Sequence, residues 1–149
     1  MQIENWNIND VKPFHNNARV HEEKSISAIK ASVDRFDWLA PIVVDDDGVI
    51  IAGHGRLSAA KELGLTEVPV LVADWLSDNE VAAAREADNM TQDLSRFDWN
   101  KLNINLEDID WIDIDMSEFG FKLDDELGDI DEESEENQDI CPTCGKPID

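Results

Sequence analysis

The sequence predicts a compact α/β or α+β domain followed by an acidic tail. Within the first 90 residues, short runs of β-branched residues alternate with segments whose apolar residues recur at helical spacing. A chain of 149 residues that is 42% hydrophobic allows one domain with one core, plus a tail. The net charge is −23, and residues 101–149, with 17 acidic and 3 basic residues, contribute −14 of it. We therefore expect a folded domain over residues 1–100.

The N-terminal third contains a predicted strand and a predicted helix. Residues 1–13 have the pattern of a strand and a turn, and residues 14–21 that of a polar loop. From Glu22 to Phe36 the apolar residues recur close to a helical period, which predicts a helix. Pro41 disfavours the α conformation in the residue before it, so the helix should end before that point.

A hairpin is predicted next. The β-branched triplets Ile42–Val44 and Val49–Ile51 flank the turn sequence Asp45-Asp46-Asp47-Gly48. An Asp-Gly step between two such triplets is a strong hairpin signal. We interpret the three aspartates as a solvated turn tip rather than as a cation site.

The second strand of this hairpin leads into a turn with two glycines, Gly53-His54-Gly55-Arg56, and then into a helix that should end at Gly64. Glycines let backbone N–H groups approach a ligand closely, and the first turn of a helix offers unpaired donors and partial positive charge. Arginine is well shaped for bidentate contact with phosphate. The pattern therefore indicates an anion site, and the alternative is a tight turn with a solvated arginine. The dinucleotide fingerprint and the P-loop both require other residues.

After this helix, residues 66–72 are predicted as a strand. Ser77 and Glu80 form a capping box at the start of a helix that should run to about Asn89. Residues 101–127 combine Ile, Leu and aromatic residues with Asp and Glu, and we interpret them as an acidic amphipathic segment that docks on its own domain or on a partner. Residues 128–149 are expected to be a disordered acidic linker with a terminal Cys-x-x-Cys knuckle.

The composition bounds the function. A polyanion repels nucleic acid, so direct DNA binding should be weak or indirect. The sequence shows no secretion signal and no apolar run of membrane-spanning length, which favours a soluble, cytoplasmic protein without membrane partners. Cys141 and Cys144 have the spacing of half a zinc site. A second chain or a partner would have to complete the Zn²⁺ site, and an unmetallated remnant is the alternative.

Six blocks of the sequence occur in a recognisable order. They are Asn17-Ala18-Arg19, Ala31-Ser32-Val33, Ala40-Pro41-Ile42-Val43-Val44, Gly48 through Ala60, Val68-Pro69-Val70 and Ala87-Asp88-Asn89. Together they resemble the ParB/sulfiredoxin-like superfamily, and most closely its ParB-like nuclease domain form of phages and mobile elements, which is often fused to DNA-modification methyltransferases. The resemblance covers residues 3–100 and implies a compact domain with a small mixed sheet and flanking helices.

The resemblance also implies a ligand. In this superfamily the corresponding turn grips the phosphates of CTP in ParB proteins, and of ATP or ADP in sulfiredoxin and a free-serine kinase. By matching positions, the phosphate-binding residues would be Gly53, His54, Gly55, Arg56, Arg19 and Asn89. Mg²⁺ is expected with the nucleotide, and the candidate catalytic residues are His54, Glu22 and Asp88. His21, with Glu22 and Glu23, is otherwise interpreted as a solvated helix start.

Some features depart from the family pattern. The turn lacks the catalytic cysteine of sulfiredoxin and has one arginine where ParB proteins usually have two. An acidic segment stands where the DNA-reading domain of ParB would follow. We therefore expect a nucleotide-binding protein, with NTPase or nuclease as the candidate activity, that acts alone or as a homodimer, or with a methyltransferase or other DNA-processing partner. The alternatives are a non-catalytic interaction or DNA-mimic protein that uses its acidic tail, and a metal-dependent DNase.

Overall fold

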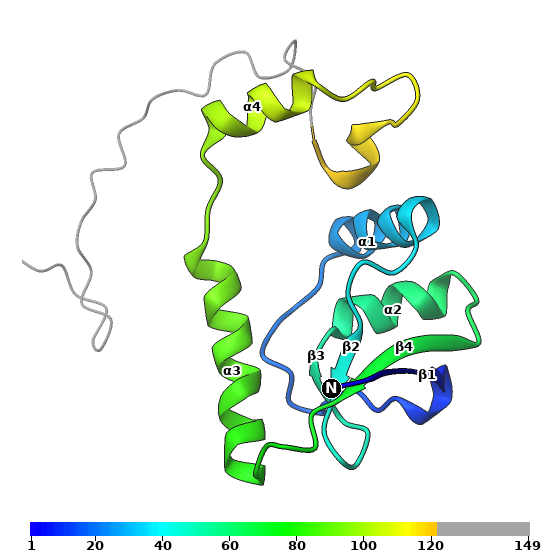
Figure 1. Ribbon diagram of the computed structural model, residues 1–149, viewed down its shortest axis with the longest axis vertical. Helices are drawn as coiled ribbons and strands as arrows, with labels where there is room; N and C mark the ends of the chain where they lie inside the picture. Colours follow the sequence, from blue (N-terminus) through cyan, green and yellow to red (C-terminus); the bar gives the residue numbers. More distant parts are fainter. Residues whose placement is uncertain (122–149) are drawn as a thin grey trace, which may run out of the picture.

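The computed structural model describes residues 1–121 and contains a four-stranded sheet with helices around it (Figure 1). The strands are β1 (Ile3–Asn7), β2 (Ile42–Val44), β3 (Ile50–Ala52) and β4 (Glu67–Val72), and they lie in the order β1-β4-β2-β3. Strand β2 runs parallel to β4, while β1 and β3 run antiparallel to their neighbours. The predicted α/β fold with a small mixed sheet and flanking helices is therefore confirmed.

The helices are α1 (Glu23–Phe36), α2 (His54–Glu62), α3 (Asp78–Leu94) and α4 (Trp99–Glu107). Helix α2 follows Gly53 directly and stops before Gly64, whose φ of +72° is the left-handed conformation expected after a helix. Helix α3 begins with the predicted capping box, in which the Ser77 backbone N–H donates to the Glu80 carboxylate at 2.8 Å. It continues past the predicted end near Asn89.

Helix α4 lies where the sequence indicated only an amphipathic segment, and the expected domain boundary at residue 100 falls inside it. The carboxylate of Asp98 caps this helix by accepting from the Lys101 backbone N–H at 3.2 Å. Beyond α4 the chain returns to α1, where the rings of Phe36 and Phe119 lie 5.4 Å apart between centroids. In this structure the acidic segment therefore contacts the chain's own α1.

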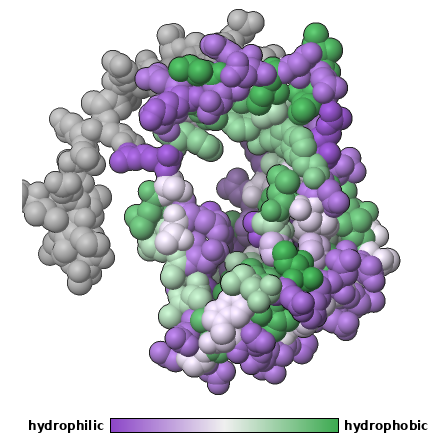
Figure 2. All heavy atoms as spheres, viewed as in Figure 1, coloured by the Kyte–Doolittle hydropathy of each residue, from purple (hydrophilic) through white to green (hydrophobic). Residues whose placement is uncertain are grey.

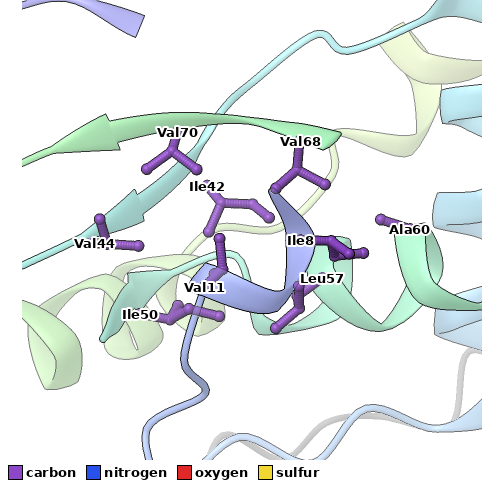
Figure 3. Packing of buried hydrophobic residues seen from close by; sticks show 9 residues of the cluster. All are labelled: Ile8, Val11, Ile42, Val44, Ile50, Leu57, Ala60, Val68 and Val70. Carbon is purple, nitrogen blue, oxygen red and sulfur yellow. The ribbon is translucent and has the colours of Figure 1, made fainter. Parts of the chain in front are cut away.

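Alternate residues of a strand point to opposite faces of the sheet, and β2, β3 and β4 contribute side chains to packing on both faces. One face packs against α2 and the turn after β1, and forms the larger core (Figure 3). The other face, with Ile51 and Ala73, packs against Val81 of α3. The larger core consists of Ile8, Val11, Ile42, Val44, Ile50, Leu57, Ala60, Val68 and Val70.

Among residues 1–121, no helix has both the length and the apolar character needed to cross a membrane. The predictions for residues 128–149, including the zinc ligands Cys141 and Cys144, lie outside the described part of the chain.

Candidate functional site

A cavity of about 200 Å³ lies where the first turn of α2, the loop before α1 and the middle of α3 meet. In the space-filling view a hollow opens beside α3, between this helix and the rest of the domain (Figure 2). All six residues predicted to bind phosphate line the cavity, together with Asp88. Its lining residues are Asn17, Arg19, His21, Ile29, Ile51, Ala52, Gly53, His54, Gly55, Arg56, Asp88, Asn89 and Gln92.

The floor of the cavity is the turn that joins β3 to α2. Gly53 is the N-cap of α2 and has a φ of +110°, a conformation that side-chain-bearing residues rarely adopt. The first N–H groups of a helix have no intrahelical partner, and here they belong to His54, Gly55 and Arg56, which line the cavity. The turn therefore presents backbone donors and the positive end of the helix dipole.

Replacing Gly53 with alanine is expected to destabilise the fold by about 2 kcal/mol, because the added Cβ brings left-handed strain. The new atom would also lie 3.3 Å from the Ile42 Cα, a backbone atom that cannot move away easily. Urea unfolding of the variant measures the loss. The matched control is Gly64→Ala, which has a positive φ but no heavy atom within 4 Å of the added Cβ. An equal loss in both variants would contradict the role given to the Ile42 contact.

Two arginines face the cavity from different elements. Arg56 of α2 is half-buried and donates one hydrogen bond, from Nη1 to the Pro41 carbonyl at 3.3 Å. Arg19, in the loop before α1, is tied to α3, since it donates to the Asn89 carbonyl at 3.3 Å and pairs with the exposed Asp93 carboxylate at 3.3 Å. Both guanidinium groups have more donors than these contacts use.

His54 is the first residue of α2, and its imidazole accepts a hydrogen bond from the backbone. Its Nε2 accepts a hydrogen bond from the backbone N–H of Phe14 at 3.1 Å, so its proton is on Nδ1. Burial lowers the pKa of His54 below its usual 6.5, and the nearby His21 and Arg85 lower that pKa further. His54 lines the cavity, and in its uncharged form with the proton on Nδ1 it can act as a hydrogen-bond donor.

His21 lies in the site, although the sequence indicated a solvated helix start. It is half-buried, and a Cβ built on Gly55 would lie 2.9 Å from its Cε1 atom and 2.8 Å from the Ile29 Cδ1 atom. The glycine is therefore what lets His21 pack on α2. Burial lowers the pKa of His21 as well, and the Arg19 charge adds to that effect.

The two histidines should make stability depend on pH. Their usual pKa is 6.5 and both pKa values are lowered in the folded chain, so the unfolded chain binds more protons as the pH falls below 6.5. The free energy of unfolding should therefore be highest above pH 6.5 with respect to these two histidines, and it should decrease as the pH falls below 6.5. Urea unfolding at several pH values measures this dependence. His21→Asn/His54→Gln should flatten it in that window, and an unchanged slope in the double variant would contradict the assignment.

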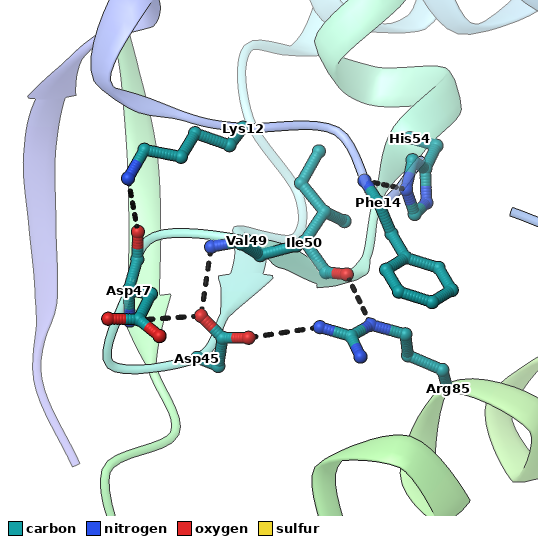
Figure 4. A network of polar contacts seen from close by, with 8 residues as sticks. All are labelled: Lys12, Phe14, Asp45, Asp47, Val49, Ile50, His54 and Arg85. Carbon is teal, nitrogen blue, oxygen red and sulfur yellow. Dashed lines mark hydrogen bonds and ion pairs between the residues drawn. The ribbon is translucent and has the colours of Figure 1, made fainter. Parts of the chain in front are cut away.

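Arg85 of α3 is a buried cation that sequence reasoning did not single out. Its Nε donates to the Ile50 carbonyl at 2.8 Å, its Nη2 pairs with Asp45 at 3.0 Å, and its guanidinium lies 4.2 Å from the centroid of the Phe14 ring (Figure 4). Asp45 also accepts hydrogen bonds from the Asp47 and Val49 backbone N–H groups. The interpretation of all three aspartates as a solvated tip is therefore wrong for Asp45 and correct for Asp46 and Asp47, which are exposed.

The predicted catalytic residues are distributed unevenly. Asp88 of α3 lines the cavity and accepts a hydrogen bond from the Gln92 side chain at 2.8 Å. Glu22 is exposed at the N-cap of α1 and does not line the cavity. His54 faces the cavity but has its Nε2 engaged by Phe14. With two arginines, two neutral histidines and one carboxylate among its lining residues, the cavity is suited to hold an anion.

Comparison with known proteins places these features in a family. The ParB N-terminal domain model matches residues 1–90. The ParB-like nuclease domain-containing protein YnaK of Escherichia coli (strain K12) is 37% identical over 73 residues, which is 49% of this chain and 84% of YnaK. A probable chromosome-partitioning protein ParB of Rickettsia typhi is 36% identical over 70 residues, 46% of this chain but only 24% of that protein. The chain thus spans about a quarter of the partitioning relative.

A solved structure extends the similarity beyond the matched domain. The crystal structure of the C-terminally truncated chromosome-partitioning protein ParB from Caulobacter crescentus, complexed with CTP-gamma-S, resembles this chain with a TM-score of 0.58 and 25% sequence identity. The match covers 82% of this chain and 67% of that one.

Proposed function

The chain belongs to the ParB N-terminal domain family, and from that premise we propose that it binds the phosphate groups of a nucleoside triphosphate, CTP or ATP, in the cavity at the start of α2. The backbone N–H groups of the Gly53–Arg56 turn, together with Arg56 and Arg19, would hold the phosphates. Asn89 would complete the wall on the α3 side.

The observation that carries this proposal is the convergence of donors on one cavity. The N-terminus of α2, the Arg56 side chain and the His54 imidazole belong to the first turn of one helix, and Arg19 comes from the loop before α1; all of these residues line the same space. A cavity of about 200 Å³ is smaller than the roughly 300–1,000 Å³ of a pocket for a whole drug-sized ligand. It is therefore suited to phosphate groups, with the nucleoside extending outside. The CTP-gamma-S in the related Caulobacter structure supports a triphosphate.

The residues present also fit Mg²⁺. Magnesium is commonly held by one or two carboxylates together with substrate phosphates. Asp88 is the carboxylate that lines the cavity, and its partner Gln92 leaves one carboxylate oxygen free of that bond. Bound Mg²⁺ would neutralise phosphate charge, and Asp88 would orient it. Glu22 is exposed and does not line the cavity, so we assign it no role in binding Mg²⁺.

We propose DNA modification or DNA processing as the context, because the sequence blocks resemble the form of this domain found in phages and mobile elements. The nucleotide would then regulate association with a protein partner such as a methyltransferase, or with a second copy of the chain.

Titration calorimetry of the full chain with CTP, ATP and ADP, each with and without Mg²⁺, tests the proposal. We expect saturable binding of a triphosphate that is strengthened by Mg²⁺. No binding of any of the three would contradict the proposed function and would favour the interaction or DNA-mimic alternative. Metal-dependent nicking of plasmid DNA without nucleotide binding would favour the DNase alternative.

A further inference from the structure

The cavity is connected to the acidic turn of the β2–β3 hairpin by a chain of contacts through Arg85 and Phe14 (Figure 4). Arg85 itself does not line the cavity. Its guanidinium is fixed at two points, by the Asp45 carboxylate at 3.0 Å and by the Ile50 carbonyl at 2.8 Å. The Arg85 side chain is 10% exposed, so these bonds form largely out of water, where they hold the group rigidly.

The fixed guanidinium contacts the ring of Phe14. It sits 4.2 Å from the centroid of the Phe14 ring, within the range of a cation–π contact. The backbone preceding Phe14 is anchored independently, because the Lys12 N–H donates to the Gly48 carbonyl and the Lys12 carbonyl accepts from the Ile50 N–H, both at 2.9 Å. Phe14 is therefore held through its ring on one side and through its backbone on the other.

The backbone N–H of Phe14 in turn determines which nitrogen of neutral His54 carries the proton. This N–H group is a donor only, so the Nε2 atom that accepts from it at 3.1 Å must carry no proton. The proton of neutral His54 is then on Nδ1. If Phe14 moved away, nothing in this contact would select between the two tautomers, and either nitrogen could present a lone pair to an anion.

We propose that Arg85 is a positioning residue of the anion site: it holds Phe14 so that the Phe14 amide keeps His54 in the Nδ1–H tautomer, which donates to a bound phosphate. This inference rests on the proposed function, since it assigns His54 a role toward the same ligand. In it, His54 is a neutral donor and transfers no proton. Arg85 does not contact His54 in this scheme. It acts through the Phe14 ring and so influences which of the two imidazole nitrogens carries the proton.

The test is the tautomer of His54 in the nucleotide-free protein, measured by two-bond ¹H–¹⁵N NMR of the imidazoles at about pH 8, where histidine is neutral. The wild-type chain should show one tautomer, protonated at Nδ1. Two variants should give a mixture of tautomers. Arg85→Met/Asp45→Asn removes both charges of the buried pair and keeps the Asp45 turn bonds through the amide oxygen, whereas Phe14→Leu keeps the backbone amide but removes the ring.

The same variants should bind the triphosphate about 2-fold more weakly if the two tautomers are equally populated, because only the chains with the proton on Nδ1 are ready to donate to the phosphate. Arg35→Met, which removes an exposed arginine far from the cavity, is the matched control and should change neither measurement. A folded variant that keeps the single Nδ1–H tautomer overturns the proposal, as does a wild-type chain protonated at Nε2. If the wild-type chain binds no nucleotide, the proposed function fails, while the tautomer spectra still decide the positioning role.

Discussion

Arg56→Ala is expected to weaken triphosphate binding about 100-fold while leaving the fold intact. A hydrogen bond to a charged group contributes about 1.5–3 kcal/mol, and a bidentate guanidinium–phosphate contact lies at the upper end of that range. The stability cost should be small, because the Arg56 side chain is half-buried and makes one hydrogen bond within the chain, to the Pro41 carbonyl. Titration calorimetry measures the affinity, and urea unfolding verifies the fold.

Two further variants isolate the cause of that loss. Arg56→Lys keeps the charge but not the planar fork, so it should bind with an affinity between those of Arg56→Ala and the wild type. Arg35→Ala removes an equal charge from α1, where the side chain is exposed and paired with Asp113 at 3.5 Å. It should bind like the wild type. Wild-type affinity in a folded Arg56→Ala variant would place the phosphates elsewhere.

Arg85→Ala should produce the largest loss of stability, about 4 kcal/mol. The substitution leaves the Asp45 carboxylate, 18% exposed, without its cation and leaves the Ile50 carbonyl without its donor. Removing one partner of a buried ion pair is costly because the remaining charge stays out of water. Urea unfolding at neutral pH measures the difference.

The comparison that makes this result informative is the exposed pair Arg19–Asp93. Its carboxylate is 70% exposed, so breaking it with Asp93→Ala should cost less than about 1 kcal/mol. The double variant Arg85→Met/Asp45→Asn should recover most of the stability lost in Arg85→Ala, because no unpaired charge remains. If Arg85→Ala and Asp93→Ala lost equal amounts of stability, burial would not explain the contribution of the Arg85–Asp45 pair, and the prediction would be wrong.

Local patterns in the sequence predicted the parts of the fold that depend on near neighbours. The β2–β3 hairpin follows from its Asp-Gly turn, the start of α3 from the capping box of Ser77 and Glu80, and the end of α2 from Gly64. The glycine turn at the cavity belongs to the same class, because its strand, glycines and helix are contiguous. These elements need no information from distant residues.

The features that were missed depend on contacts between distant residues. Arg85 lies on a mostly polar helix and has the pattern of a solvated residue, but its partners are Asp45 and Ile50, far earlier in the chain. His21 lies in a loop without periodicity, and only the close approach of Gly55 reveals its position. Helix α4 was missed because its apolar residues merge with the acidic pattern that follows.

The attachment of α3 implies an uneven distribution of local stability. The smaller core under α3 has three fully buried members, Ile51, Ala73 and Val81, whereas the larger core on the opposite face of the sheet has nine. Arg85, in the middle of the helix, adds buried polar contacts to the smaller core, and Arg19 contacts the helix farther along, at Asn89 and Asp93. Sub-global opening should therefore begin at the distal end of α3, with its amides exchanging with solvent before those of α2. Because Asp88 and Asn89 lie between Arg85 and that end, the α3 wall of the cavity should lose its protection before the α2 wall does.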